Sequence, residues 1–174
     1  MGISGNYRSP QIDRIRLNDD GSFKQVVGTM KGVEQLKLFD PYGFVSAVTM
    51  SHQAGIDVVD SAGDPFVRTV PGSWIRITGV DFRYGTDVMS ISAMSKDGGT
   101  VYVLLDSMNG PVAAKIDIAR NSQSMSEFVA PFKTEGTHDL YFVFTGEIDL
   151  NGWEAYSETG HVYPTDHTAS SKAP

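Results

Sequence analysis

The amino-acid sequence predicts an all-β fold in which two antiparallel sheets pack face to face as a jelly-roll-like β-sandwich. Helical periodicity is almost absent, because no stretch of a dozen residues spaces its apolar side chains three and four positions apart. Short runs of β-branched and aromatic residues occur instead, separated by turn-forming sequences such as KDGG (96–99), SMNG (107–110) and TEG (134–136). Many short strands with close connections are typical of a sandwich or a barrel.

The expected strands follow one another after Pro41. Several of them alternate, so that in TVYVLLD the side chains of Val101 and Val103 point to one face and those of Tyr102 and Leu104 to the other. We expect the face of Val101 and Val103 to be the core side. The nine predicted strands cover residues 45–50, 56–60, 73–82, 87–95, 100–106, 112–119, 126–132, 139–146 and 153–157.

The chain divides into three predicted parts. Residues 1–40 are predicted to form a hairpin, with an Asn-Asp-Asp-Gly turn between two strands, followed by a linker. A lone hairpin is at best marginally stable, so we expect it to pack on another domain. The sandwich is expected at 41–157, and the polar, proline-containing residues 158–174 are predicted to form a flexible tail.

Composition excludes several classes of protein. The 174-residue chain has a formal net charge of −7 and no cluster of Lys and Arg, which argues against nucleic-acid binding. It has no cysteine, so disulfides and thiolate metal sites are excluded. No apolar run is long enough to span a membrane, and the first residues lack the apolar core of a signal peptide. The chain is either cytoplasmic or, as we expect, a piece of a longer protein that is extracellular or periplasmic.

Three blocks of sequence carry a resemblance to a known family. They are PGSWIRITGVDF (71–82), KDGGTVYVLLDSMNG (96–110) and GTHDLYFVFTG (136–146). In this order and spacing, the blocks are similar to those of the family 6 carbohydrate-binding modules, which are galactose-binding-like β-sandwiches usually attached to hydrolases of plant polysaccharides. The resemblance spans residues 45–156 and implies a non-catalytic module that binds a plant cell-wall polysaccharide, with xylan or arabinoxylan as the expected target.

The N-terminal stretch carries a second resemblance. YRSPQIDRIRLNDDGSFKQVVGTMKGV (7–33) is similar to the last hairpin of the family 43 glycoside hydrolase propeller, found in arabinofuranosidases and xylosidases. This resemblance implies that the chain is the C-terminal end of such an enzyme. The catalytic carboxylates would then lie upstream of this sequence, and the parent hydrolase domain would be a partner of the sandwich.

The resemblance also implies where sugar would bind. Aromatic rings stack on the apolar face of a sugar ring, while a few polar groups fix its orientation. The family's cleft uses a Tyr, a Trp and an Asn, and the corresponding positions here fall at or near Arg68, Met125 and Asp149. Because Arg68 and Met125 are not flat rings, a module that has lost its sugar site remains an alternative. The candidate carbohydrate-binding residues are Phe66, Arg68, Met125, Asp149, Asn151 and Tyr102.

Tyr102 is a candidate for a different reason from the other five residues. It lies opposite the core side of its strand together with Leu104, and Tyr141 and Val143 lie opposite the core side of theirs. If the two strands share a sheet, these side chains form an exposed apolar patch that binds a sugar chain or the parent hydrolase domain. The alternative is apolar residues scattered over the surface. By contrast, both tryptophans, Trp74 and Trp153, are expected in the core.

The family's structural calcium depends on a Glu-Ala-Glu segment at the start of the first strand. The corresponding segment here is VSAV, which puts Ser46 and Val48 in the carboxylate positions. Calcium needs six to eight oxygen ligands, several of them charged, so we expect this ion to be lost and no other cofactor to replace it. Asp57, Asp60 and Asp64 could form a looser calcium site, but we expect a solvated acidic edge.

The His138-Asp139 pair could be half of a catalytic dyad or a feature of the fold. No strained nucleophile motif accompanies the pair, so we expect its side chains to bond turn backbone at the entrance to a strand. A glycosidase would need two carboxylates at a characteristic separation, and no spacing among the 21 acidic residues indicates such a pair. The sequence therefore favours a binding module over an enzyme, with a purely structural domain that buttresses a hydrolase as the alternative.

Overall fold

The computed structural model describes residues 13–27, 37–120 and 124–158. It divides into two compact units, one ending at Lys37 and the other beginning at Leu38. Residues 28–36 of the predicted linker and nearly all of the predicted tail lie outside the described residues. None of the described residues belongs to a helix that could cross a membrane.

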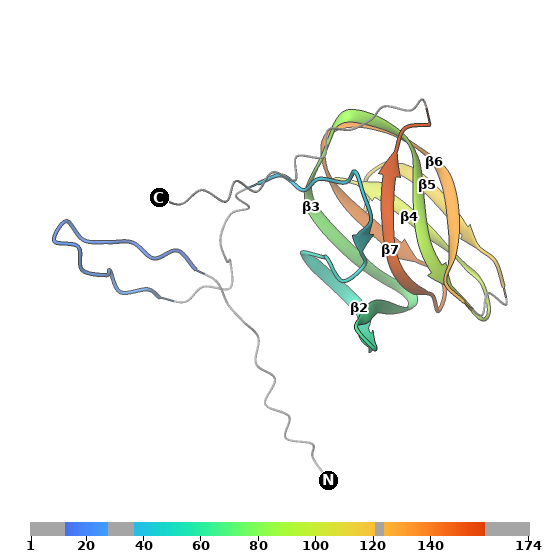
Figure 1. The fold of residues 1–174 in the computed structure, drawn as a ribbon, viewed down its shortest axis with the longest axis horizontal. Helices are drawn as coiled ribbons and strands as arrows, with labels where there is room; N and C mark the ends of the chain where they lie inside the picture. The colour runs from blue at the N-terminus through green and yellow to red at the C-terminus, as the bar shows by residue number, and fades with distance from the viewer. Residues whose placement is uncertain (1–12, 28–36, 121–123, 159–174) are drawn as a thin grey trace, which may run out of the picture. The chain divides into compact units, whose positions relative to one another are not determined.

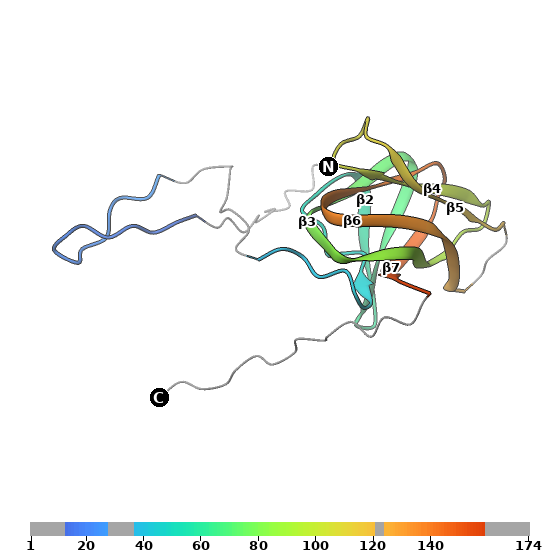
Figure 2. The same ribbon diagram turned by 90° about the horizontal axis from the view of Figure 1, so that it is seen from above.

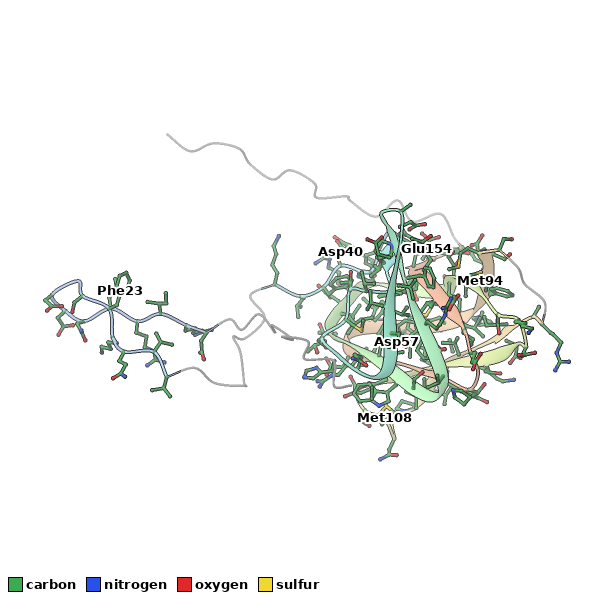
Figure 3. The ribbon with its side chains drawn as sticks, turned by 90° about the horizontal axis from the view of Figure 1, so that it is seen from below. Phe23, Asp40, Asp57, Met94, Met108 and Glu154 are labelled. Carbon is green, nitrogen blue, oxygen red and sulfur yellow. The ribbon has the colours of Figure 1, made fainter. Side chains whose placement is uncertain are left out.

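The first unit contains the predicted hairpin (Figure 1). Leu17 and Phe23 pair as an antiparallel bridge, and the amide of Asn18 donates to the carbonyl of Ser22 across the turn at 2.8 Å. Gly21 has a φ of +82°, which the Asn-Asp-Asp-Gly turn requires and glycine adopts without strain. Leu17 is 56% exposed and Phe23 is 74% exposed; Phe23 is labelled in Figure 3. A hairpin therefore forms here, with its large apolar side chains in solvent.

The described residues of the second unit form β-strands and no α-helix, which confirms the all-β prediction. The strands form one continuous antiparallel ladder in the order β1-β7-β3-β6-β4-β5, with β2 paired to β3 (Figure 1). Their bounds are β1 Val45–Ser46, β2 His52–Ser61, β3 Asp64–Met94, β4 Gly99–Leu105, β5 Val112–Ile118, β6 Ser126–Phe144 and β7 Asp149–Tyr156.

Two long strands, β3 and β6, bend from one layer of the sandwich into the other (Figure 2). The first half of β3 pairs with the second half of β6, and the second half of β3 pairs with the first half of β6. We call the layer with β2, residues 64–82, residues 136–144, β4 and β5 the first sheet. The layer with β1, β7, residues 86–94 and residues 126–134 is the second sheet.

These bends correct several predicted strand boundaries. The strands expected at 73–82 and 87–95 are one strand, and so are those at 126–132 and 139–146. TEG (134–136) is not a turn, because β6 continues through it while the register shifts and Gly136 takes a φ of +83°. The strand predicted at 45–50 is reduced to Val45–Ser46.

The hydrophobic core lies between the two sheets and follows the predicted alternation. Val101, Val103 and Phe142 are fully buried, and Trp153 packs on Phe142 with the ring centroids 5.6 Å apart. The prediction for Trp153 is confirmed. The prediction that Trp74 belongs to the core is wrong: its neighbour Ile75 points inward, so Trp74 lies half-buried on the outer face of the first sheet.

The His138-Asp139 pair ties the matching sequence blocks together. Asp139 accepts a hydrogen bond from the amide of Gly79 at 2.8 Å and another from Arg76 at 2.6 Å. His138 Nδ1 lies 3.0 Å from Asp106, and its Nε2 lies 3.1 Å from the carbonyl of Glu135. Neither ring nitrogen is thus directed at a hydroxyl nucleophile of the described residues. The pair holds backbone, as predicted, although it lies within β6 and not at the entrance to a strand.

Candidate functional site

Four of the predicted site residues meet at one end of the sandwich. Arg68 of β3 and Asp149 of β7 are register partners, and their side chains form two hydrogen bonds of 2.8 Å. The guanidinium of Arg68 also lies over the ring of Phe66, 5.6 Å from its centroid. Asn151 donates to Asp64 at 2.8 Å. We call this group, Phe66, Arg68, Asp149 and Asn151, the rim cluster.

The polar groups of the rim cluster largely satisfy one another. The hydrogen bonds that Arg68 donates to Asp149 raise the pKa of the Arg68 guanidinium, which stays fully charged. Phe66 is only 8% exposed, and Arg68 covers its ring. The cluster therefore offers a guanidinium edge to a ligand but no open aromatic face on which a sugar could stack.

The remaining two predicted residues lie in different places. Ser126 pairs with Ala93, so Met125, the residue before Ser126, lies beside Met94. Met94 pairs with Asp149 of the rim cluster, and Met125 is therefore at the same end of the sandwich. Tyr102 lies on β4 in the first sheet and is not brought to this end. The structure thus separates the predicted site into a rim and a sheet face.

The sheet face is larger than the predicted patch. Tyr102 and Leu104 of β4 pair with Val143 and Tyr141 of β6, which confirms that these strands share a sheet. Trp74 of β3 pairs with Val143 on its other side and adds a third ring to the face. We call the outward-facing side chains Trp74, Tyr102, Leu104, Tyr141 and Val143 the Trp74 face.

The rings of the Trp74 face are tilted against one another and only partly open to solvent: Trp74 and Tyr102 are half-buried, and Tyr141 is 9% exposed. The centroids of Trp74 and Tyr141 are 6.0 Å apart, with an angle of 44° between the ring planes. The Arg76 guanidinium lies 5.5 Å from the centroid of Tyr141, and its hydrogen bond to Asp139 raises the pKa of Arg76. A permanently charged donor therefore borders the aromatic surface.

Polar side chains also border the opposite end of the Trp74 face. Thr100 donates to Asp117 at 2.7 Å, and Lys115, the register partner of Tyr102, donates to the same carboxylate at 3.0 Å. Apolar ring surface between hydrogen-bonding groups is the arrangement that binds a polyhydroxylated ring. Sequence reasoning missed Trp74 as part of this surface, although strict alternation from the apolar Ile75 and Ile77 would have placed it outward.

The positions of the family's structural calcium do not fit that ion. Ser46 offers one hydroxyl and pairs with Gly152 in the β1–β7 ladder, and Val48 offers no ligand atom. Within the ranges that the structure describes, no group of three or more Asp, Glu, His or Cys side chains could hold a metal ion. The expected absence of calcium stays a prediction, because the structure contains no ligands that could test it.

The acidic residues of the β2–β3 hairpin have separate environments. Asp57 is exposed on β2 (Figure 3), and its register partner is Arg68. Asp60 accepts a hydrogen bond from the amide of Gly63 in the turn at 3.0 Å, and Asp64 accepts one from Asn151. These carboxylates therefore serve turn and rim contacts, in agreement with a solvated edge.

Comparisons with known proteins agree on one family. The family described as Carbohydrate binding module (family 6) matches residues 46–156. An arabinoxylan arabinofuranohydrolase of Paenibacillus polymyxa is 30% identical over 176 aligned positions, which cover 92% of this chain and 28% of that enzyme. The chain thus spans less than a third of the length of this relative.

Solved structures extend the similarity to the fold. A family 43 arabinoxylan arabinofuranohydrolase of Bacillus subtilis, in complex with cellotetraose, superimposes with a TM-score of 0.80 and 26% identity, over 87% of this chain and 34% of that one. A family 6 module of Clostridium cellulolyticum, in complex with xylose, superimposes with a TM-score of 0.63 and 25% identity, over 68% of this chain and 99% of that one.

Proposed function

The chain belongs to carbohydrate-binding module family 6, and we propose that its module binds xylan or arabinoxylan through the Trp74 face. The observation that supports this face is the presence of Trp74 and Tyr141 side by side, 6.0 Å apart, on an outer sheet surface that also carries Tyr102. Trp74 and Tyr102 are half-buried and present ring surface to solvent, whereas Tyr141 is only 9% exposed and packs against Trp74. At the rim, Phe66 is 8% exposed beneath Arg68 and has no half-buried ring beside it among the rim cluster residues. The proposal therefore moves the main binding contact from the rim to the sheet.

The class of ligand is supported by the chemistry of the face and by the relatives. The face lies across β3, β6 and β4, and a surface of this kind can contact several sugar rings of one chain. The relative from Paenibacillus polymyxa is named for its action on arabinoxylan, and the Clostridium cellulolyticum module was solved with xylose. A polymer of pentoses with pendant arabinose fits both observations.

The module itself is non-catalytic, and its proposed role is accessory. Because the chain corresponds to about a third or less of the hydrolases that it matches, we infer that it accompanies the catalytic domain of a glycoside hydrolase. A cell-wall substrate requires an extracellular or periplasmic location. The alternative, a structural domain that buttresses a hydrolase through the Tyr102 face, would use the same surface, so binding of arabinoxylan by this chain is what separates the two.

Affinity electrophoresis in gels containing soluble arabinoxylan tests the proposal, with calorimetry on xylo-oligosaccharides as the quantitative measure. Aromatic anchors at binding surfaces contribute about 2 kcal/mol or more, so Trp74→Ala should weaken binding more than tenfold, whereas Trp74→Phe should retain part of it. The matched control is Phe23→Ala, which removes an exposed ring from the hairpin. Retardation of wild type and Trp74→Ala to the same extent would refute the role of this face, and no retardation of the wild type would refute the proposed function.

A further inference from the structure

The bend of β3 contains a large bulge. Phe82 pairs with Gly136 and Thr86 pairs with Thr134, so the three residues between Phe82 and Thr86 stand opposite Glu135 alone. A bulge interrupts the ladder and turns side chains away from the sheet, and it is common near functional sites. Here the middle residue of the bulge is an aromatic one, Tyr84.

A second tyrosine supports this bulge. The hydroxyl of Tyr42 accepts a hydrogen bond from the amide of Tyr84 at 3.0 Å and donates one to the carbonyl of Gly85 at 3.3 Å. The two tyrosine rings are 5.6 Å apart, and the guanidinium of Arg83 lies 5.3 Å from the centroid of Tyr84. Tyr84 is therefore held in place, yet its side chain remains 44% exposed.

Tyr84 lines a pocket of about 460 Å³ at the bend, which is within the usual range for small-molecule sites. Arg68 and Met94 lie near the two ends of β3, and both pair with Asp149 at the rim. The bend in the middle of β3, and the pocket beside it, therefore lie at the opposite end of the sandwich from the rim cluster. Neither the Trp74 face nor the rim cluster contributes a residue to its wall.

The polar wall of the pocket combines donors and acceptors. Lys133 provides an ammonium group, and Glu135 and Asp87 provide carboxylates. The carboxylate of Asp87 already accepts a hydrogen bond from the hydroxyl of Ser157 at 2.6 Å. Lys133 and Glu135 are both exposed on β6 and form no ion pair with the described residues. The wall thus carries both signs of charge, which favours neither a strongly anionic nor a strongly cationic ligand. Hydroxyl groups both donate and accept, so an uncharged sugar suits this wall.

We propose that this pocket, the bend pocket, is a separate binding site for one or two uncharged sugar rings. The Tyr84 ring contacts the apolar surface of the sugar, and Lys133, Glu135 and Asp87 bind its hydroxyls. The inference rests on the proposed function, since it assumes a carbohydrate ligand, but it concerns a site on another part of the module. Two such sites would allow one module to contact two chains, or two parts of one chain, of the same polysaccharide.

Nuclear magnetic resonance titration of the whole 174-residue chain with xylotriose can observe both sites at once. We expect saturable shifts of the amides of Gly85 and Thr134 in the wild type and also in Trp74→Ala. The variant Tyr84→Ala should lose these shifts or bind at this site about three- to tenfold more weakly, because the ring contact is removed while the backbone bond to Tyr42 is kept. Lys133→Met, which keeps the ring and the fold, should weaken the same shifts.

The outcomes separate the two proposals. Saturable shifts at Gly85 and Thr134 that survive Trp74→Ala and weaken in Tyr84→Ala and Lys133→Met support the bend pocket. If xylotriose shifts only amides of the Trp74 face, the bend pocket is refuted and the proposed function stands. If neither region responds to xylotriose, and arabinose and cellotriose also produce no shift, both proposals fail.

Discussion

Replacing Asp139 by Ala should destabilise the sandwich by about 3 kcal/mol, because the change breaks two charge-assisted hydrogen bonds that each contribute about 1.5–3 kcal/mol. The carboxylate bonds the amide of Gly79 and the guanidinium of Arg76, with the two side chains of the ion pair only 23% and 28% exposed. The Nε atom of Arg76 is already buried and has no hydrogen-bond partner among the residues that the structure describes, so losing Asp139 would leave this guanidinium poorly satisfied. The estimate takes the lower end of the sum of the two bonds because the site is partly open to water.

Urea unfolding followed by tryptophan fluorescence measures this cost. Single domains are stable by about 5–15 kcal/mol. A loss of about 3 kcal/mol should therefore clearly lower the urea concentration at the midpoint of unfolding and lower the melting temperature by roughly 10 °C. Asp139→Asn keeps an acceptor for Gly79 and should cost about half as much. The exposed pair at the rim is the control, since Asp149→Ala removes an ion pair whose Arg68 is 54% exposed and should cost about 1 kcal/mol or less.

The double variant Arg76→Met with Asp139→Ala isolates the interaction between the two side chains. We expect it to be less destabilised than the sum of the single variants, because it leaves no unpaired guanidinium. If Asp139→Ala costs less than about 1 kcal/mol, the structural interpretation of the His138-Asp139 pair would be wrong, and a functional role for the conspicuous His-Asp sequence would have to be reconsidered.

Two further predictions concern metal and pH. Because Ser46 and Val48 replace two carboxylates, adding EDTA or millimolar calcium should leave the melting temperature unchanged, and a calcium-dependent rise of several degrees would contradict this. Burial, together with the nearby carboxylates of Glu127 and Glu154, raises the pKa of the Tyr156 phenol, so the folded phenol keeps its proton longer than the unfolded one. Stability should therefore fall as the pH rises above about 10. Absorbance titration at about 295 nm should show a late phenolate step that Tyr156→Phe removes, and an unchanged titration curve would refute the assignment.

Alternation within a strand was the most reliable guide to the fold. It assigned Val101 and Val103 to the core and Tyr102 to the opposite face without knowledge of the partner strands. Strand ends were harder to predict, since glycines such as Gly85 and Gly136 are usually found in turns. In the structure Gly85 lies in the bulge of β3 and Gly136 is paired with Phe82 beside it, because pairing between β3 and β6 continues on both sides. That pairing joins residues far apart in the sequence and has no local signal.

The site was predicted less well than the fold, for a similar reason. Counting along motifs correctly brought Arg68 and Asp149 to one place, but only the β3–β7 register makes them an ion pair that satisfies both side chains. Trp74 was assigned to the core from its motif, and the register of β3 with β6 instead places it beside Tyr141. Cross-strand neighbours decide which side chains form a surface, and a single sequence does not contain them.

The same alternation explains how a binding surface can change position while the fold stays constant. In β6, Phe142 faces the core and is fully buried, while its neighbours Tyr141 and Val143 belong to the Trp74 face. A substitution at a half-buried outer position such as Trp74 or Tyr102 removes less core contact than one at Phe142, so rings can be exchanged there at a lower cost in stability. The rim can likewise carry Arg68 of β3 where other members of the family have a ring, with its partner Asp149 on the neighbouring strand β7. A module that lacks rings at its rim can therefore still bind sugar on its sheet, provided that the outward positions of the central strands carry them, as Trp74, Tyr102 and Tyr141 do here.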